Sequence, residues 1–221
     1  MASPPDQIYC WDITYLFTLV RGSYFYLYLF VDLFSRKVVG WQVYDCESAE
    51  SARELLQDIC ARLGITAGQL VVHSSNGAPM KGETMLATMQ RLGVVPSRSR
   101  PSVSNGNPYS ESLFRALKYR PVMPVKPFEN LFQARRWVTD LVHWYNNEHG
   151  RSAICFVTPT QCHAGQDKQL LAGCAAVYET ARQTHPQRWS KQCRNWRHVD
   201  QVHLNLDTPK PKEVETLKKT A

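Results

Sequence analysis

The 221-residue sequence has no Cys-x-x-Cys pair, although it contains seven cysteines. Zinc ribbons and thioredoxin-like redox sites are therefore not indicated, because both depend on closely spaced cysteine pairs. The sequence also begins without a basic segment followed by an apolar run, which argues against a secretory signal. It contains no internal repeat and no low-complexity block. These absences favour a globular cytoplasmic protein with reduced thiols.

An uninterrupted hydrophobic run is missing as well. The most apolar stretch, residues 13–34, is interrupted by Arg21 and Gly22 and contains Asp32. A membrane-spanning helix needs about 20 consecutive apolar residues, so this stretch is better interpreted as two strands around a turn. We therefore expect no membrane association.

The sequence does contain an ample apolar fraction and unevenly placed charge. Hydrophobic residues make up 43% and aromatic residues 11%, which is enough for a sizeable core. The net charge is +7, and residues 81–136 alone hold ten basic and three acidic groups. Residues 182–221 hold nine basic and four acidic groups. Two such basic blocks favour a polyanionic partner, most often nucleic acid, and the alternative is a solvated basic surface.

The hydrophobic pattern predicts an α/β fold with a mixed five-stranded sheet. Strands are expected at residues 8–20, 24–33, 37–44, 69–73 and 94–97. Helices are expected at residues 48–63, 79–92, 109–119, 128–148 and 167–183, and a short strand or hairpin within 186–208. Short turns between the first three strands indicate an antiparallel meander. The later strands alternate with helices, which predicts parallel strands and helices on both faces of the sheet.

Acidic residues occur where the predicted strands could carry a site. Asp12 lies within the first strand and Asp32 near the end of the second. If the turn is centred on Gly22, these two carboxylates are cross-strand neighbours on one face. The fourth strand runs into residues 73–77, and Glu111 opens the helix after the loop 102–108. In open α/β sheets, ligands bind at the carboxyl ends of strands.

Five ordered blocks carry a resemblance to a known family. They read WDITYL, YLYLFVDLFSRKVVGW, VVHSSNGAPM, NPYSESLFRALKYRP and WYNNEHGRSAICFVTPTQ. The chain resembles the OrfB-type transposases of bacterial insertion sequences, whose catalytic core is similar to retroviral integrases. The resemblance extends from Gln7 to Leu204, nearly the whole chain. It implies an RNase H-like fold, in agreement with the strand order, and a C-terminal helical extension.

The resemblance also implies a catalytic centre of two Asp and one Glu that holds Mg²⁺ or Mn²⁺ in a two-metal site. Asp12 matches the first Asp and Glu111 matches the Glu. The second Asp belongs in a His-Ser-Asp-x-Gly block, which here reads His-Ser-Ser-Asn-Gly from His73 to Gly77. Ser75 therefore stands at the position of the missing Asp. The 35 residues between Ser75 and Glu111 match the interval that is usual in the family.

This substitution bears on the expected activity. Family members join a DNA 3′-hydroxyl to a phosphodiester, and two metal ions hold the attacking and leaving oxygens. A neutral Ser hydroxyl is a poor ligand, and losing about 4 kcal/mol of transition-state stabilisation means roughly a thousandfold in rate. We therefore expect this chain to be strongly impaired or inactive. Asp32 is the nearby carboxylate that could partly compensate as a metal ligand, although tying down the Ser35-Arg36 turn is the preferred interpretation.

Double-stranded DNA, as element ends and target, is the partner that the resemblance implies. Lys118 lies seven residues after Glu111, two turns along the same helix face, and is a candidate for a phosphate contact. Further candidates for DNA contacts flank the loop and this helix. They are Arg98, Arg100, Asn105, Arg115 and Arg120. Affinity that comes from such phosphate contacts falls steeply with salt.

We expect four segments along the chain. They are an N-terminal leader at 1–7, the catalytic core at 8–160, a C-terminal extension at 161–208 and a disordered tail at 209–221. Full-length family members carry helix-turn-helix modules before the core, so we expect this chain to be a fragment or a truncated reading frame. Without those modules, it should recognise the element ends only weakly. We also expect self-association or pairing with a full-length transposase, in a nucleoid-associated location.

Two other functions stay open on the sequence alone. The first is a non-catalytic DNA-binding remnant or dominant-negative partner of an active transposase, which Ser75 favours. The second is a stand-alone RNase H-type nuclease, which the long helical region 109–148 disfavours. Three cysteines stand where relatives often carry Arg, and with Ser75 they motivate the hypothesis of a decaying copy. They are Cys155, Cys162 and Cys174.

Overall fold

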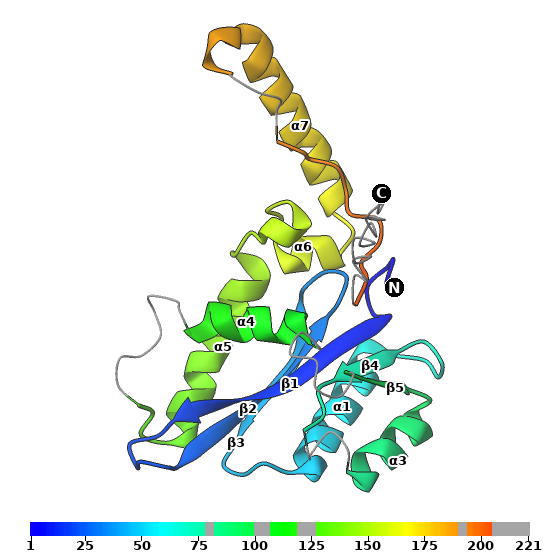
Figure 1. The fold of residues 1–221 in the computed structure, drawn as a ribbon, viewed down its shortest axis with the longest axis vertical. Coiled ribbons are helices and arrows are strands. Elements are labelled where there is room, and N and C mark those ends of the chain that lie inside the picture. Colours follow the sequence, from blue (N-terminus) through cyan, green and yellow to red (C-terminus); the bar gives the residue numbers. More distant parts are fainter. Residues whose placement is uncertain (78–81, 100–106, 119–126, 190–193, 205–221) are drawn as a thin grey trace, which may run out of the picture.

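A mixed five-stranded sheet forms the centre of the molecule (Figure 1). The structure is a computed structural model that describes residues 1–77, 82–99, 107–118, 127–189 and 194–204. The strands are β1 (Ile8–Phe17), β2 (Tyr24–Asp32), β3 (Val38–Tyr44), β4 (Val71–Ser74) and β5 (Val95–Arg98). Their order in the sheet is β3-β2-β1-β4-β5. The first three are antiparallel, and β4 and β5 continue in parallel with β1, as the sequence predicts.

Helices cover both faces of this sheet. They are α1 (Ala49–Leu63), α3 (Glu83–Leu92), α4 (Pro108–Lys118), α5 (Leu131–Asn147), α6 (Pro159–His163) and α7 (Asp167–Thr184). Single 3-10 turns occur at Ser152–Ile154 and Pro186–Arg188. One apolar cluster joins α1 and α3 to the sheet, and a second joins α4 and α5 to its other face. The RNase H-like arrangement of helices on both faces is therefore confirmed.

The alternation along β1 assigns its residues to these two faces. Tyr9 and Trp11 are fully buried in the cluster with α1 and α3. Leu16 belongs to the cluster with α4 and α5. Because successive side chains of a strand point to opposite faces, Asp12 lies on the face that α4 covers. The strand thus positions Asp12 toward the helix that carries Glu111.

Local signals account for the boundaries of α1. Ser48 caps the helix, because its hydroxyl accepts a hydrogen bond from the Ser51 N–H at 3.0 Å. Gly64 ends the helix in the left-handed conformation, at φ 64°, which glycine adopts without steric cost. These bounds agree with the helix expected at residues 48–63.

The C-terminal part of the chain differs from the prediction of a strand or hairpin within 186–208. Among the described residues of this segment, one isolated β-bridge occurs, between Val202 and Ala2. Trp196 and Val199 instead pack against the apolar cluster that contains Ala2 and Leu171. Side-chain packing against the core and α7 thus takes the place of strand pairing. The expected tail at 209–221 lies outside the described residues.

Helix α7 extends away from the sheet, with α6 between it and the core (Figure 1). Of its residues, Asp167 and Leu171 are buried. Helix α6, which the sequence analysis missed, begins with a capping box in which Thr158 and Gln161 bond reciprocally. In the part of the chain that the structure describes, no helix is both long and apolar enough to cross a membrane.

Candidate active site

Asp12 stands in the middle of β1 and is half-buried on the α4 side of the sheet. Its Oδ1 accepts a hydrogen bond from the backbone N–H of Ile13 at 2.9 Å. Residues of α4 approach this strand directly, and three residues separate Asp12 from Ile8 and four from Phe17, the two ends of β1. Asp12 is thus a carboxylate held inside the sheet rather than at a strand end.

Glu111 lies in the first turn of α4 and is exposed. The start of this helix is tied to β1 by Asn107, whose Nδ2 donates a hydrogen bond to the Trp11 carbonyl at 3.1 Å. The Glu111 N–H in turn bonds to the Asn107 carbonyl at 3.2 Å. These contacts tie the start of α4 to Trp11, the residue before Asp12, and the charge of Glu111 acts on the Asp12 carboxyl.

The environment of Asp12 disfavours its charged form. Burial raises the pKa of Asp12 to about 6, the Ile13 N–H opposes this shift, and the negative charge of Glu111 adds to it. Each negative charge makes ionisation of the other carboxyl less favourable, and a cation between the two carboxylates would offset this repulsion. The pair is therefore a candidate cation site on electrostatic grounds.

The raised pKa predicts a pH-dependent gain in stability from Asp12→Asn. An acid with a folded-state pKa of about 6 stabilises the fold below its unfolded pKa, and this contribution is lost as pH rises through 6. At pH 7.5, the free energy of unfolding of the variant should therefore exceed that of the unmodified chain by up to about 3 kcal/mol. At pH 3.5, the two values should differ little. Urea unfolding at both pH values measures this, and an equal change at both would contradict the burial of the charge.

Ser75 follows β4 at the same level of the sheet as Asp12. Trp11 pairs with Ser74 in the parallel register of β1 and β4, so the next residues along the two strands are Asp12 and Ser75. The adjacent Asn76 donates a hydrogen bond from Nδ2 to the Ser99 carbonyl at 2.9 Å. His73 is buried, with its Nδ1 2.9 Å from the Ser97 hydroxyl. These contacts fix the end of β4 beside Asp12.

The expected pairing of Asp12 with Asp32 is wrong. Asp12 pairs with Leu29, and Asp32 pairs with Tyr9. Tyr9 is three residues before Asp12 on β1, and its side chain lies on the sheet face that α1 and α3 cover. The turn between the strands is centred near residues 20 and 21 rather than on Gly22, which shifts the register by three residues. Asp32 is thus not a cross-strand neighbour of Asp12.

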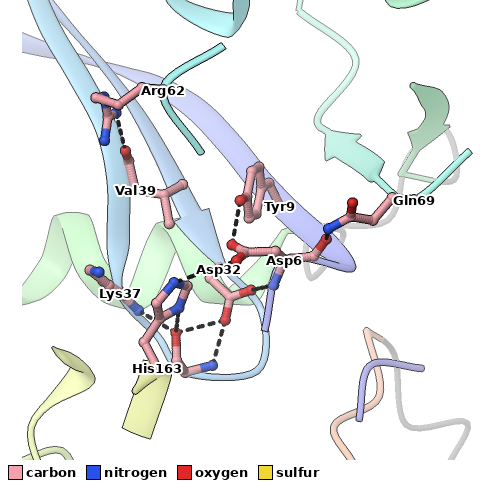
Figure 2. Close-up of polar contacts among 9 residues, drawn as sticks. Asp6, Tyr9, Asp32, Lys37, Val39, Arg62, Gln69 and His163 are labelled. Atoms are coloured by element: carbon pink, nitrogen blue, oxygen red, sulfur yellow. Dashed lines mark hydrogen bonds and ion pairs between the residues drawn. The ribbon is translucent and has the colours of Figure 1, made fainter. Parts of the chain in front are cut away.

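Asp32 instead lies in a polar cluster beside the N-terminal end of β1 (Figure 2). It is fully buried, and its Oδ1 accepts hydrogen bonds from the Ser35 N–H and hydroxyl at 2.7 and 2.6 Å. Its Oδ2 accepts a bond from the Asp6 N–H at 3.0 Å. The contacts with Ser35 fit the preferred interpretation that Asp32 holds the turn before β3. Burial raises the pKa of Asp32, and its hydrogen bonds oppose that shift.

The candidate DNA-contacting residues are only partly described. Arg98 is exposed at the end of β5, and Arg115 is exposed on α4. Lys118 is the last residue of α4, so positions 111, 115 and 118 share one helix face. The other three candidates, Arg100, Asn105 and Arg120, lie outside the described residues.

Two features of the site region escaped the sequence analysis. Asn107 is almost fully buried, and its Oδ1 has no hydrogen-bond partner among the described residues. An Asn directly before a Pro is typical of a helix start, and this signal could have identified it. The second feature is the contact of Asp32 with Asp6 and His163, which are far apart in sequence and carry no spacing signal.

Comparison with known families decides the relationship. Two family models, each described as an integrase core domain, match residues 2–104 and 92–159, and together they cover well over half of the chain. The chain belongs to the integrase core domain family. The match includes Asp12, Ser75 and Glu111, so all three positions of the candidate site lie within it.

The relatives of this integrase core include transposases of insertion sequences. It is 27% identical over 163 residues to a transposase for insertion sequence element IS904 of Lactococcus lactis, covering 72% of this chain and 61% of the relative. It is 32% identical over 117 residues to transposase InsF for insertion sequence IS3A of Escherichia coli, covering 53% and 40%. The chain thus spans about 40–60% of the length of these relatives.

Solved structures with the same fold are viral integrases. The catalytic core domain of HTLV-2 integrase, in complex with magnesium, has a TM-score of 0.53 at 15% identity, covering 72% of this chain and 97% of that one. A simian T-cell lymphotropic virus intasome chain has a TM-score of 0.59 at 18% identity, covering 73% and 55%. These likenesses show the fold of the integrase core.

Proposed function

We propose that this integrase core is the catalytic part of an insertion-sequence transposase, which cleaves and joins DNA phosphodiester bonds. The single observation that carries the proposal is the placement of Asp12, Glu111 and Ser75. Residue 12 on β1 and residue 75 after β4 stand in adjacent register positions, and Glu111 acts on Asp12 from α4. This arrangement supports one site built from three distant parts of the chain, all within the residues that the integrase core models match.

The residues present fit a divalent cation, but incompletely. Asp12 and Glu111 offer hard carboxylate oxygens, which Mg²⁺ and Mn²⁺ prefer, while Ser75 offers a neutral hydroxyl. A bound Mg²⁺ would polarise the phosphodiester and activate the attacking hydroxyl or water. With two carboxylates instead of three, we propose that the two-metal arrangement is weakened. The magnesium complex of the HTLV-2 core supports the choice of metal.

The chain's own residues have separable roles in this proposal. Asp12 holds a negative charge that burial and Glu111 make costly, so the pair binds a cation more readily than either acid alone. Asn107 positions Glu111 by fixing the start of α4 to β1. Arg98, Arg115 and Lys118 orient the DNA backbone by contacts with phosphates. Ser75 leaves one ligand position without charge.

A second candidate function rests on Ser75 alone. Without the third carboxylate, the protein could act as a DNA-binding partner that pairs with an active transposase and lowers its output. Self-association or pairing with a full-length transposase, and a nucleoid-associated location, belong to both candidates. The dimeric form named for the HTLV-2 core supports self-association.

DNA binding is expected to be strongly dependent on salt. If Arg98, Arg115 and Lys118 contact phosphates, affinity for a labelled DNA duplex should fall roughly 10- to 100-fold between 50 and 200 mM NaCl. Arg98→Ala and Arg115→Ala should each weaken binding several-fold and reduce the salt dependence. Arg53→Ala on α1, on the other sheet face, is the matched control and should change nothing. Affinity that does not vary with salt would contradict the role of these residues.

The catalytic proposal is tested by a nicking and strand-transfer assay in Mg²⁺ and Mn²⁺. The chain is fused to a heterologous DNA-binding module, which supplies recognition of the substrate DNA. Product from Ser75→Asp that disappears when Glu111→Gln is added supports the proposal. Absence of product from a folded, DNA-bound Ser75→Asp protein in both metals contradicts it.

A further inference from the structure

A second cluster of metal-ligating side chains lies away from the candidate active site. Asp6 precedes β1, Asp32 ends β2, and His163 ends α6 (Figure 2). One ligand atom from each of the three lies within 4.8 Å of the others. Asp32 is three strand positions from the level of Asp12, which corresponds to about 10 Å. The cluster is therefore separate from Asp12 and Glu111.

Hydrogen bonds around the cluster determine which nitrogen of His163 carries a proton. Ser35 Oγ lies 2.6 Å from Asp32 Oδ1 and donates its only hydrogen there, because a carboxylate cannot donate. Ser35 Oγ also lies 3.1 Å from His163 Nδ1. The hydroxyl must accept at this second contact, so Nδ1 carries the hydrogen. In the neutral ring, Nε2 then has a free lone pair.

That lone pair faces a second acceptor. His163 Nε2 is 3.6 Å from Asp6 Oδ2, which is too long for a hydrogen bond. Two lone pairs that face each other in a mostly buried place repel, and a cation between them would turn this repulsion into attraction. Neither side chain is more than about a quarter exposed, at 13% and 26%.

We propose that Asp6, Asp32 and His163 bind a divalent transition-metal ion, with zinc as the best match. Zinc bonds to imidazole nitrogen and carboxylate oxygen are about 2.0–2.2 Å long. His163 Nε2 and Asp6 Oδ2, which are 3.6 Å apart, can therefore bind the same ion. One nitrogen and two oxygens favour zinc over magnesium, which prefers oxygen alone. Water completes a four-coordinate shell.

The surrounding hydrogen bonds are those that a metal site needs. Metal-bound His side chains usually donate their other N–H to an acceptor that fixes the ring, and His163 does so through Ser35. The ligating carboxylates are oriented too. Tyr9 donates its hydroxyl hydrogen to Asp6 Oδ1, and the Asp6 N–H donates to Asp32 Oδ2. The ligands are thus held in place before an ion binds.

An ion at this position would join three separate parts of the chain. Asp6 belongs to the segment before β1, Asp32 to the sheet, and His163 to the helix that leads into α7. The bound metal would fix the start of the C-terminal extension to the end of the sheet. Its role is therefore structural, and the inference does not depend on the proposed function.

Zinc binding by the full chain tests the inference. Metal content is measured by equilibrium dialysis, and thermal unfolding is followed with and without zinc. His163→Asn retains a donor for Ser35 but has no imidazole lone pair, and Asp6→Asn retains an acceptor for Tyr9 but has no charge. The exposed His143→Asn on α5 is the matched control. The double variant Asp12→Asn/Glu111→Gln removes the candidate catalytic carboxylates.

We expect one zinc ion per chain, retained in the control and in the double variant. We expect a loss of affinity of at least tenfold in His163→Asn and in Asp6→Asn. Zinc at about 100 times its dissociation constant should raise the melting temperature of the unmodified chain by roughly 5–10 °C. The inference is overturned if the chain retains no zinc at micromolar concentration, or if both ligand variants retain it. It is also overturned if zinc is lost in the double variant alone.

Discussion

Replacing Ser75 by Asp is expected to raise the rate of nicking and strand transfer by roughly a thousandfold. The substitution adds a carboxylate next in register to Asp12, where the third metal ligand of the family would stand. A third charged ligand is expected to recover about 4 kcal/mol of transition-state stabilisation, which corresponds to that factor. The assay compares Ser75→Asp with the unmodified chain, each fused to the same heterologous DNA-binding module.

Ser75→Asn is the matched control, because Asn has nearly the shape of Asp without its charge. It should leave the rate close to that of the unmodified chain. Equal rates of nicking and strand transfer in the unmodified chain and in Ser75→Asp would mean that Ser75 does not impair the site. Inactivity of all three proteins, with DNA binding retained, would favour the non-catalytic partner over the transposase core.

Asp32→Ala is expected to lower the free energy of unfolding by about 3–5 kcal/mol. The fully buried carboxylate accepts three hydrogen bonds, two from Ser35 and one from the Asp6 N–H. Truncation leaves these donors without partners in a place that water does not reach, and each such loss costs about 1–3 kcal/mol. Urea unfolding at pH 7 in EDTA, so that no cation contributes, measures the change.

Two controls separate the buried network from a general effect of losing an acid. Ser35→Ala removes the hydroxyl donor and should cost only about 1 kcal/mol. Asp200→Ala removes a carboxylate that is 84% exposed, and should change stability by less than about 0.5 kcal/mol. A cost for Asp32→Ala no larger than that for Asp200→Ala would contradict the structural role of Asp32.

The sheet was predictable because its strands alternate and because turn residues separate them. The register was not, because Gly22 suggested the centre of the first hairpin. Gly22 does adopt a positive φ of 83°, but it lies late in the loop between Phe17 and Tyr24. The Thr18 hydroxyl lies within the loop, 3.1 Å from the carbonyls of both Val20 and Ser23, and can donate its hydrogen to either. A difference of three residues in the turn centre was enough to separate Asp12 from Asp32.

The sequence could indicate the site of Asp12 and Glu111, but not the cluster of Asp6, Asp32 and His163. Asp12 and Glu111 occur in blocks that resemble a family, so their positions could be named before the structure. Asp6 and His163 are 157 positions apart, and no local pattern connects them. Their approach depends on the packing of α6, a five-residue helix that the hydrophobic pattern did not predict. Sites built from such short elements become visible only in three dimensions.

The central claim is that Asp12 and Glu111 form one cation site beside residue 75. The most direct measurement is a crystal structure of the Ser75→Asp variant grown with MnCl₂, with the ion located by its anomalous scattering. The account predicts manganese bound by the carboxylates of Asp12 and Glu111 and by the introduced carboxylate. Carboxylates of Asp12 and Glu111 more than about 10 Å apart, or manganese bound elsewhere alone, would contradict it.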